Sequence, residues 1–378
     1  MTQLQPPPGL TRRQFIGLLA ASGVTAAGGY ALSESTPWLN YEAKADQVRA
    51  PLATGSVTTD IQNLVRAATL AASSHNTQPW TFVARQGSIE IHPDRSRQLL
   101  VLDPQGRELW ISLGCALENL LVAAHAAGYG TDVAYPDTDE VIRVRLSAGS
   151  PQASPLFAAI VHRQKTRSLY HAQPVQHPVL RQLQAVSSEP GVTVQFVLEP
   201  SERSTVLEYV NQGNLKQYAD PAFVQELIHW LHFTRKDALA SLDGLYTRSS
   251  GNPEVPRWLG QMVVGGTRPK NQADADAAKF RSSLGAVVIA SQTDDRAAWV
   301  RSGQVYERLA LQMTALGVQS AFLNQPIEVN SVRRQFQRAM KLKPALPQLL
   351  MRFGHTPAGA AALPRSLRRP VSQVLATL

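Results

Sequence analysis

The chain has 378 residues, which is long for one average domain and comfortable for two. With 44% hydrophobic and 17% charged residues, it has the composition of a globular protein that can bury a sizeable core. A net charge of +9 admits a nucleic-acid partner, but the arginines are scattered and no zinc-finger or helix-turn-helix spacing occurs, so we expect none. The single cysteine, Cys115, excludes an intramolecular disulfide and cysteine-based metal clusters.

The first residues have the pattern of an export signal. Arg12 and Arg13 precede a charge-free apolar run, residues 15–31, that is rich in Gly and Ala. The stretch "TRRQFI" resembles a twin-arginine translocation signal, which implies export by the twin-arginine machinery to the periplasm or cell envelope. Such export suits proteins that fold around a cofactor first. The run is at the short limit for a membrane span, so an uncleaved anchor is the alternative to a cleaved signal over 1–31.

The next segments predict a linker, a helix and a hairpin. Residues 32–57 are polar and read as a linker. The stretch "TDIQNLVRAATLAAS" predicts a helix capped by Thr59 or Asp60. The stretch "TFVARQGSIEIHP" predicts a hairpin with a Gln-Gly turn. Between them lies the stretch "AASSHNTQPWTF", whose polar groups are dense for a helix-to-strand corner.

Two long apolar helices, residues 107–128 and 296–317, repeat one another at an offset of 189 residues. The identical positions are Arg107/Arg296, Trp110/Trp299, Gly114/Gly303, Glu118/Glu307, Leu120/Leu309, Ala126/Ala315 and Gly128/Gly317. This pattern indicates an internal duplication. The shared Gly114 and Gly303 predict close packing, either of helix on helix or of helix on a flat ligand.

The corner also recurs in altered form. The stretch "SSEPGVTVQFV", residues 187–197, keeps the serines and Phe-Val at an offset of 114 residues but lacks the Asn, Gln, Pro and Trp. The two offsets differ by 75 residues, which predicts an insert in the second copy, about residues 215–270. We therefore expect two related α+β halves, residues 58–150 and 151–378.

The insert combines a helix containing His229, Trp230 and His232 with a Gly/Pro-rich loop. Aromatic groups on a hinged element suit a lid over an apolar ring system, and a second packed layer is the alternative. His229-x-x-His232 is the strongest metal-like spacing in the chain, but a solvated or packed helix face explains it better. We expect no metal site.

Three stretches resemble the nitroreductase-like flavoproteins. The corner is similar to the family's Ser-x-x-Asn-x-Gln-Pro-Trp run, "HRQKTRSLY" (residues 162–170) resembles its N-terminal Arg-x-Ser/Thr-x-Arg/Lys box, and "LMRFGHTP…LPRSLRRPV" resembles its closing strand and basic tail. The tandem arrangement is similar to the branch called Acg-like. The resemblance implies an α+β nitroreductase-like fold, with antiparallel-rich sheets flanked by helices. It also implies a monomer whose two halves mimic the family's homodimer as a fused pseudo-dimer.

The resemblance further implies FMN as the cofactor. The implied contacts are Arg163, Gln164, Lys165, Arg167, Arg368 and Arg369 for the phosphate, Ser73, Asn76 and Gln78 for the ring edge, and Asn324 and Gln325, with Glu328 nearby, for the loop over the ring. Guanidinium groups suit a phosphate, and amides suit a ring edge that donates and accepts. Lys165 stands where the family has Ser or Thr, with Thr166 one place later. The alternative for Asn76 and Gln78 is a helix C-cap or turn. Because each recognition element occurs once, we expect one FMN per chain.

These expectations combine into a function. The chain is expected to be an exported FMN-dependent oxidoreductase of nitroreductase type that reduces nitro, quinone-like or other electron-poor small molecules by two-electron steps. The flavin carries the redox chemistry, so no catalytic side chain is singled out. The electron donor is unknown. The alternative is a protein that binds or sequesters FMN beneath a covered ring, with little reductase activity.

Overall fold

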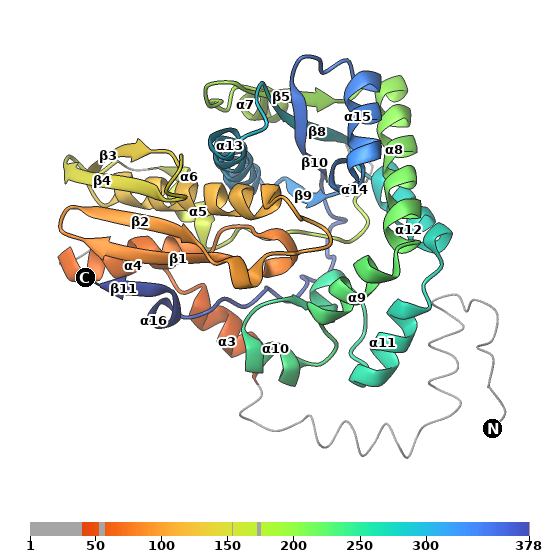
Figure 1. Ribbon diagram of the computed structural model, residues 1–378, viewed down its shortest axis with the longest axis horizontal. Coiled ribbons are helices and arrows are strands. Elements are labelled where there is room, and N and C mark those ends of the chain that lie inside the picture. The colour runs from red at the N-terminus through yellow and green to blue at the C-terminus, as the bar shows by residue number, and fades with distance from the viewer. Residues whose placement is uncertain (1–39, 53–56, 153, 172–174, 378) are drawn as a thin grey trace.

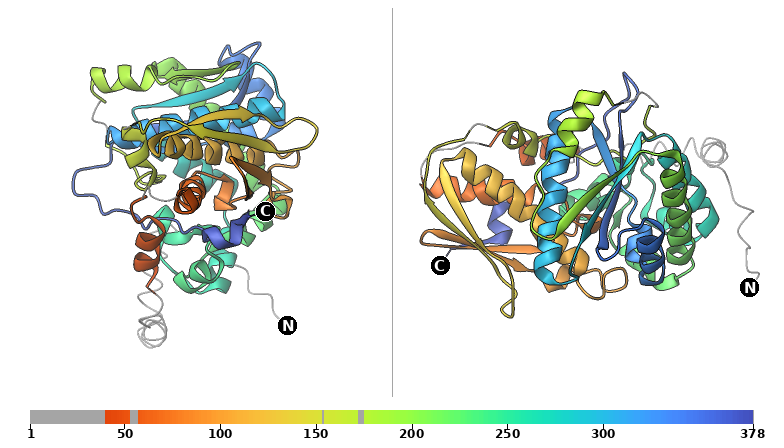
Figure 2. Two further views of the ribbon diagram at one scale, coloured as in Figure 1. Left: turned by 90° about the vertical axis from the view of Figure 1, so that its left-hand side faces the viewer. Right: turned by 90° about the horizontal axis from the view of Figure 1, so that it is seen from above.

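The computed structural model describes residues 40–52, 57–152, 154–171 and 175–377. The predicted signal, residues 1–31, lies outside the described residues. Two antiparallel-rich sheets lie on either side of two long helices, α5 (Arg107–Ala126) and α13 (Arg296–Ala315) (Figure 1). Seen from above, the layers run from the first sheet through the central helices to the second sheet and then to outer helices (Figure 2). The expected α+β class is confirmed.

The first sheet has the strand order β11-β1-β2-β4-β3. Its strands are β1 (Trp80–Arg85), β2 (Ser88–Pro93), β3 (Tyr129–Ala134), β4 (Ile142–Ala148) and β11 (Leu375–Thr377). The expected hairpin is confirmed as β1 and β2, and Gly87 at its turn has a φ of 71°, a conformation that glycine adopts without a steric penalty. β11 comes from the end of the chain and pairs with β1 in parallel. The last strand of the second half therefore completes the sheet of the first.

The second sheet has the strand order β5-β8-β10-β9. Its strands are β5 (Val192–Val197), β8 (Gly285–Ser291), β9 (Gln319–Phe322) and β10 (Leu346–Gly354). Every residue of β8 is buried, because one sheet face packs on α13 and the other is covered by helices. In both halves two strands precede the long helix and two follow it, and the four strands take the same spatial order. This repeated strand order is what an internal duplication of the chain predicts.

The central helices cross at their shared glycines. A methyl group on Gly114 would overlap the carbonyl of Val300, and one on Gly303 would overlap the carbonyl of Ile111. The two backbones thus approach more closely than any side chain allows, so the packing is helix on helix and involves no flat ligand. Within the described residues, α5 is the one helix long and apolar enough to cross a membrane by length and composition, but it is mostly buried in the core.

Three differences from the expected elements concern the first helix, the linker and the insert. α4 (Val57–Thr69) begins before Thr59 and Asp60, so both lie inside the helix, and the predicted cap is wrong. Thr and Asp are tolerated there because the first-turn N–H groups have no intrahelical partner.

The predicted linker contains a helix, α3 (Tyr41–Val48), so a polar linker over all of 32–57 is wrong. Asn40 caps it by accepting from the Ala43 amide at 2.9 Å. Tyr41 is buried against Tyr246, with ring centroids 4.5 Å apart, and its hydroxyl donates to the Arg365 carbonyl at 2.8 Å. One buried helical face is enough to dock this otherwise polar segment.

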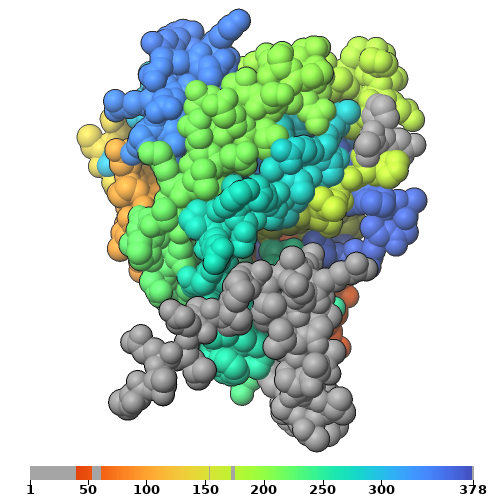
Figure 3. Space-filling model, turned by 90° about the vertical axis from the view of Figure 1, so that its right-hand side faces the viewer, coloured from red at the N-terminus to blue at the C-terminus, as the bar shows by residue number. Residues whose placement is uncertain are grey.

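The insert between β5 and β8 starts earlier than predicted, at Pro200. It comprises α8 (Pro200–Tyr218), α9 (Pro221–His229), β6 (Leu231–His232), α10 (Arg235–Ser241), β7 (Leu245–Tyr246), the 3-10 helix η3 (Thr247–Ser250), α11 (Arg257–Gly265) and α12 (Pro269–Arg281). α8 and α12 lie side by side on the outer surface (Figure 3) and cover the second sheet. This part of the insert is thus a packed layer, while α9 to α11 extend toward the first half (Figure 1).

The remaining elements are short connections. They are the 3-10 helices η1 (Ser74–Asn76) and η2 (Arg95–Arg97) and the helices α6 (Pro155–Ile160), α7 (His177–Gln184), α14 (Gln325–Glu328), α15 (Asn330–Ala339) and α16 (Val371–Val374).

Candidate functional site

The polar corner between α4 and β1 has an unusual backbone. His75, Asn76 and Gln78 have φ angles of 46°, 55° and 53°, in the left-handed region. Asn and His enter this region more readily than most residues, but Gln is less suited to it. Such conformations persist only where the surroundings enforce them, and they cluster at functional sites. Side chains from other parts of the chain hold the backbone of this corner in place.

Arg368, from the C-terminal tail, holds the end of α4. Its Nε donates to the Thr69 carbonyl at 2.8 Å and its Nη2 to the Ala71 carbonyl at 3.0 Å. Its Nη1 donates to Asn76 Oδ1 at 2.8 Å. Every guanidinium nitrogen thus has a protein acceptor. The last carbonyls of a helix have no donor within the helix, and Arg368 supplies donors to them. In this structure Arg368 caps α4, and each of its guanidinium nitrogens already donates to a protein acceptor rather than to a phosphate.

Arg369 clamps the other side of the corner. Its amide donates to Gln78 Oε1 at 2.9 Å, and its Nη2 donates to the carbonyls of Gln78 and Trp80 at 2.8 and 3.0 Å. The carbonyls of this irregular turn have no secondary-structure partner, so a guanidinium satisfies them. Arg369 thus has a structural role in this corner, while its Nε has no hydrogen-bond partner among the described residues, and its predicted phosphate contact stays a prediction.

The corner amides face a loop of the insert, residues 242–244. Asn76 Nδ2 donates to the Gly244 carbonyl at 3.0 Å, and Gln78 Nε2 donates to the Leu242 carbonyl at 2.9 Å. The Gly244 amide donates back to the Asn76 carbonyl at 3.2 Å. Ser73 Oγ accepts from the Gln78 amide at 3.1 Å. The donors predicted for a ring edge are thus satisfied by the protein itself, as the alternative of a turn anticipates.

Asp243 fastens this loop. Its carboxylate accepts from Arg97 Nη1 at 2.7 Å and lies 3.5 Å from His232 Nε2. Burial acts to raise the pKa of Asp243, but hydrogen bonds from His232 and Arg97 outweigh it and lower the pKa. Asp243 therefore stays ionised at neutral pH, and the loop remains tied to the first half.

The predicted arginine box divides into a paired and an open part. Arg163 is buried; its Nε lies 2.6 Å from Glu307 Oε1, and its Nη2 donates to the Leu70 carbonyl at 2.7 Å. Glu307 Oε2 also accepts from the Ala72 amide at 3.3 Å. Gln164 Nε2 donates to the Leu363 carbonyl at 2.9 Å. Arg163, Gln164 and Glu307 thus tie the box to the end of α4.

Lys165 and Arg167 form the open part. Lys165 Nζ lies 4.2 Å from the ring centroids of both Tyr306 and Phe322. Burial and then the charge of Arg163 hold the pKa of Lys165 well below its usual range. Burial also lowers the pKa of Arg167, whose guanidinium forms no hydrogen bond or ion pair with a described residue. Lys165 Nζ also donates to Ser320 Oγ at 3.4 Å. Two basic side chains without an ion-pair partner among the described residues favour an anion as their ligand, since an anion would also stabilise the charged form of Lys165.

Two neutral groups stand beside these cations. His75 Nδ1 and the fully buried Tyr306 hydroxyl have no hydrogen-bond partner among the described residues. Burial, assisted by the charge of Arg167, lowers the pKa of His75 to about 4. We call Lys165, Arg167, His75 and Tyr306 the donor cluster. Buried polar groups that lack partners mark a place where a ligand can supply them.

The predicted loop over the ring makes other contacts. Asn324 Oδ1 accepts from the Leu350 amide at 2.8 Å, and Gln325 Nε2 donates to Asp276 Oδ2 at 3.0 Å. Burial, reinforced by the charge of Glu108, raises the pKa of Glu328 to about 8. Asn324 and Gln325 thus bind β10 and α12, and neither makes a hydrogen bond to the donor cluster.

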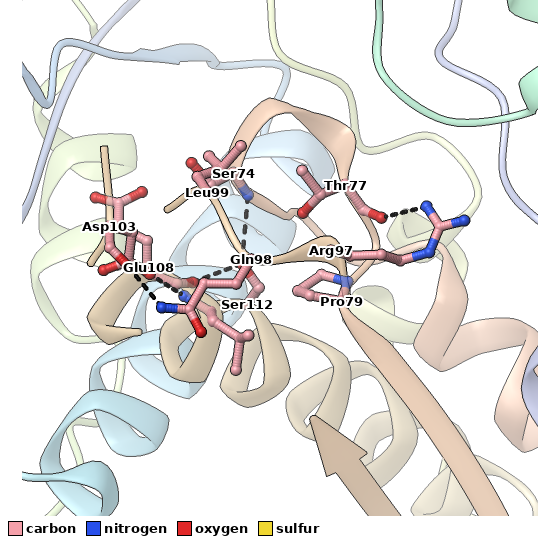
Figure 4. Close-up of a pocket in the computed structure, with 10 residues that line it drawn as sticks. Ser74, Thr77, Pro79, Arg97, Gln98, Leu99, Asp103, Glu108 and Ser112 are labelled. Atoms are coloured by element: carbon pink, nitrogen blue, oxygen red, sulfur yellow. Dashed lines mark hydrogen bonds between the residues drawn. The ribbon is translucent and has the colours of Figure 1, made fainter. Parts of the chain in front are cut away.

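A small pocket opens on the other side of the corner (Figure 4). It is lined by Ser74, Thr77, Pro79, Arg97, Gln98, Leu99, Asp103, Glu108, Leu109 and Ser112. Its free internal volume is about 10 Å³, room for about one water molecule, so a larger ligand could enter only if the surrounding loops moved.

Asp103 is a pocket residue that the sequence did not single out. Burial, together with the charge of Glu108, raises its pKa to about 7, so it is partly protonated at neutral pH. A perturbed carboxyl group in a concave site can act as a proton donor. Asp103 also accepts from the Leu109 amide at 2.9 Å, as a helix-capping residue does. In the sequence, an Asp shortly before a helix is therefore read as a cap rather than as a proton donor.

Comparisons with known proteins give relatives over most of the chain. No family model matches it. The chain is 28% identical over 323 residues to "Putative NAD(P)H nitroreductase Rv3131" of Mycobacterium tuberculosis, covering 83% of this chain and 90% of that protein. It is 25% identical over 327 residues to "Putative NAD(P)H nitroreductase acg" of the same organism, covering 84% and 96%.

Solved structures of nitroreductases are more distant. The FMN-dependent nitroreductase NfnB of Mycobacterium smegmatis, in complex with NADPH, matches at 13% identity and a TM-score of 0.39, covering 58% of this chain and 96% of that one. A nitroreductase with bound FMN from Desulfitobacterium hafniense matches at 11% identity and a TM-score of 0.36, covering 57% and 94%. Likenesses at these TM-scores carry no argument about the site. The names of the near full-length relatives support the nitroreductase-like family, with its Acg-like members, for this chain.

Proposed function

We propose that the protein is an exported FMN-dependent oxidoreductase of nitroreductase type, which reduces nitro, quinone-like or other electron-poor small molecules by two-electron steps. The observation that carries the proposal is the donor cluster, found in a chain whose relatives are named as NAD(P)H nitroreductases. The relatives' names also make a nicotinamide the natural electron donor. Export would separate the protein from cytoplasmic nicotinamides, and another donor would then be needed.

The donor cluster fits the phosphate of FMN better than the predicted tail arginines do. Lys165 and Arg167 supply an amine and a guanidinium without ion-pair partners among the described residues, and Tyr306 supplies a hydroxyl without a partner. A phosphate dianion would satisfy all three groups. When bound, FMN supplies the two-electron redox chemistry.

The side chains of the protein would orient the ring of the cofactor and supply a proton to the substrate. If the 242–244 loop opened, the amides of Asn76 and Gln78 would lose their partners in the loop and could meet the edge of a ring system. Asp103, with its pKa of about 7, can donate a proton to a substrate that gains negative charge on reduction. Leu99 and Leu109 line the same pocket and help to exclude water from that carboxyl group.

Arg167→Gln should weaken FMN binding by about tenfold to a hundredfold, because a hydrogen bond to a charged group contributes roughly 1.5–3 kcal/mol. Titration of the flavin-free protein, followed by quenching of FMN fluorescence, measures the affinity and should give one FMN per chain. Arg181→Gln on α7 is the control, because Arg181 is exposed. Equal affinities for the two variants, or two FMN per chain, would contradict this site.

Sequestration of FMN is the second candidate function. The observation that favours it is the docked 242–244 loop, whose carbonyls already bind the amides of Asn76 and Gln78. A loop that stays in place would cover the corner and keep substrates from the ring. The two functions differ in whether this loop opens.

Asp243→Asn should release the loop, because it removes the charge that Arg97 and His232 contact. The rate at which dithionite reduces the bound FMN should rise about tenfold or more, from the loss of one such bond. Asp274→Asn is the matched control, since Asp274 pairs with Lys270 on the exposed face of α12. If the wild-type protein turns over a nitroaromatic substrate as fast as the variant, the loop does not gate the site and sequestration is excluded.

Export is proposed from the twin-arginine pattern alone. Replacement of Arg12 and Arg13 by lysines should retain the folded protein in the cytoplasm, because the translocation machinery reads the arginine pair. Fractionation of cells followed by immunoblotting locates the protein. Unchanged export of the variant would remove this part of the proposal and leave the flavin site untouched.

A further inference from the structure

α11 has two different faces. Its buried face packs Gly260 against the ring of Phe233 so closely that a methyl group on Gly260 would overlap the ring. Its outer face exposes Trp258 by 67%, Met262 by 59% and Val263 by 43%. Trp258 and Met262 are one helical turn apart and therefore lie on the same side of the helix. We call these three exposed residues the α11 patch.

The surroundings of the patch are basic. Residues 244–272 contain Arg248, Arg257, Arg268 and Lys270 and one acidic residue, and Lys270 is paired with Asp274 at 3.0 Å, which leaves the three arginines. The acidic one, Glu254, is bound by Arg235 at 3.2 Å. Arg257 and Arg268, at the two ends of the patch, are exposed and form no ion pair with a described residue. The patch thus combines exposed apolar side chains with a surplus of positive charge.

The patch also lies at the end of the molecule where the described chain begins. α3, α10 and α11 lie at the same end in the view of Figure 1, and a turn of that view about the vertical axis leaves α3 and the insert at the same level (Figure 2). The apolar run of residues 15–31 ends nine residues before Asn40. Nine residues span at most about 30 Å, so a bilayer that holds this run lies close to α3.

We propose that the α11 patch docks on the surface of an anionic membrane. Trp258 and Met262 enter the boundary between headgroups and acyl chains, while Arg257 and Arg268 contact lipid phosphates. A protein partner fits less well, because stable protein interfaces bury about 800 Å² on each side, far more than three side chains provide. The proposal is independent of the flavin site.

The test places one reporter on the patch of the full chain. Met262→Cys is labelled with an environment-sensitive dye; Cys115 is buried and is therefore not labelled. Vesicles of equal parts phosphatidylcholine and phosphatidylglycerol should shift the emission to the blue, and vesicles of phosphatidylcholine alone should have a much weaker effect. The control is the same label at Leu215→Cys on α8, an exposed position outside the patch, which should not respond.

Charge variants complete the test. Arg257→Gln and Arg268→Gln, introduced in the labelled chain, should each weaken partitioning into anionic vesicles by about fivefold. Three results would overturn the proposal: vesicle binding that leaves the Met262→Cys label unchanged, an equal response at Leu215→Cys, or a shift that depends on protein concentration without vesicles. The first would assign membrane binding to residues 15–31 alone, and the last would assign the patch to a second copy of the chain.

Discussion

Glu307→Gln should destabilise the protein by about 3–5 kcal/mol, the cost of removing one partner from a buried ion pair. Glu307 is fully buried, lies 2.6 Å from Arg163 and faces a set of charges that is otherwise positive. Burial and the charge of Arg163 already lower the pKa of Arg368 to about 9, and Glu307 counteracts this shift. Glutamine keeps the shape and an acceptor for the Ala72 amide but removes the compensating charge. Urea-induced unfolding measures the loss.

The duplication supplies a matched control for this experiment. Glu118 occupies the same position in the first half and binds Arg308, which is more exposed and has Glu189 as a second partner at 2.8 Å. Glu118→Gln should therefore cost clearly less than Glu307→Gln. Inorganic phosphate should restore part of the stability lost in Glu307→Gln, because an anion can replace the missing charge. Equal losses in the two variants, with no effect of phosphate, would mean that the cations near Glu307 need no counter-charge.

Gly114→Ala should destabilise the protein by about 3 kcal/mol, at the upper end of the usual cost of overpacking. The new methyl group would meet the Val300 backbone carbonyl, which cannot move without shifting α13. Gly303→Ala should have a similar effect, since its methyl group meets the Ile111 carbonyl. Unfolding midpoints measure both variants. The double variant should lose less than the sum of the two, because separating the helices once relieves both overlaps.

A glycine elsewhere in a helix provides the comparison. Gly265 in α11 has Ile228 as its nearest neighbour, at an ordinary contact distance of 3.9 Å. Gly265→Ala should be neutral or should stabilise by up to about 1 kcal/mol through helix propensity. If Gly114→Ala behaves like Gly265→Ala, the two central helices are not in backbone contact.

The sequence predicted elements with strong local patterns and missed those that depend on distant partners. Hydrophobic spacing gave the helices, and alternation with a Gln-Gly turn gave the β1–β2 hairpin. The repeated Gly114 and Gly303 indicated close packing, and the structure then identified the partner. α3 was missed because only Tyr41 and Ala45 are buried in an otherwise polar stretch, and their neighbours, such as Tyr246 and Leu367, lie far away in the sequence.

The candidate site shows the same limit. The residue types of the arginine box and the tail are those that bind phosphate, but a sequence does not show which acceptors come near them. Arg368 meets the carbonyls of α4 about 300 positions earlier in the chain, and it is fully used there. Lys165, in contrast, departs from the family pattern, yet it stands among the open donors. Burial and competition for acceptors decide these roles, and both depend on the fold.

The parallel pairing of β11 with β1 has a consequence for synthesis. Residues 368–377 clamp the corner through Arg368 and Arg369 and supply an edge strand of the first sheet. The first half is made early, but its sheet and its corner can be completed only when residues 368–377 have left the ribosome. Closing so long a loop carries a large entropic cost, so this step is expected to come late in folding. A ribosome that stalls before residue 368 thus leaves a chain whose β1 edge is unpaired, and synthesis of residues 368–377 becomes a checkpoint for the native state.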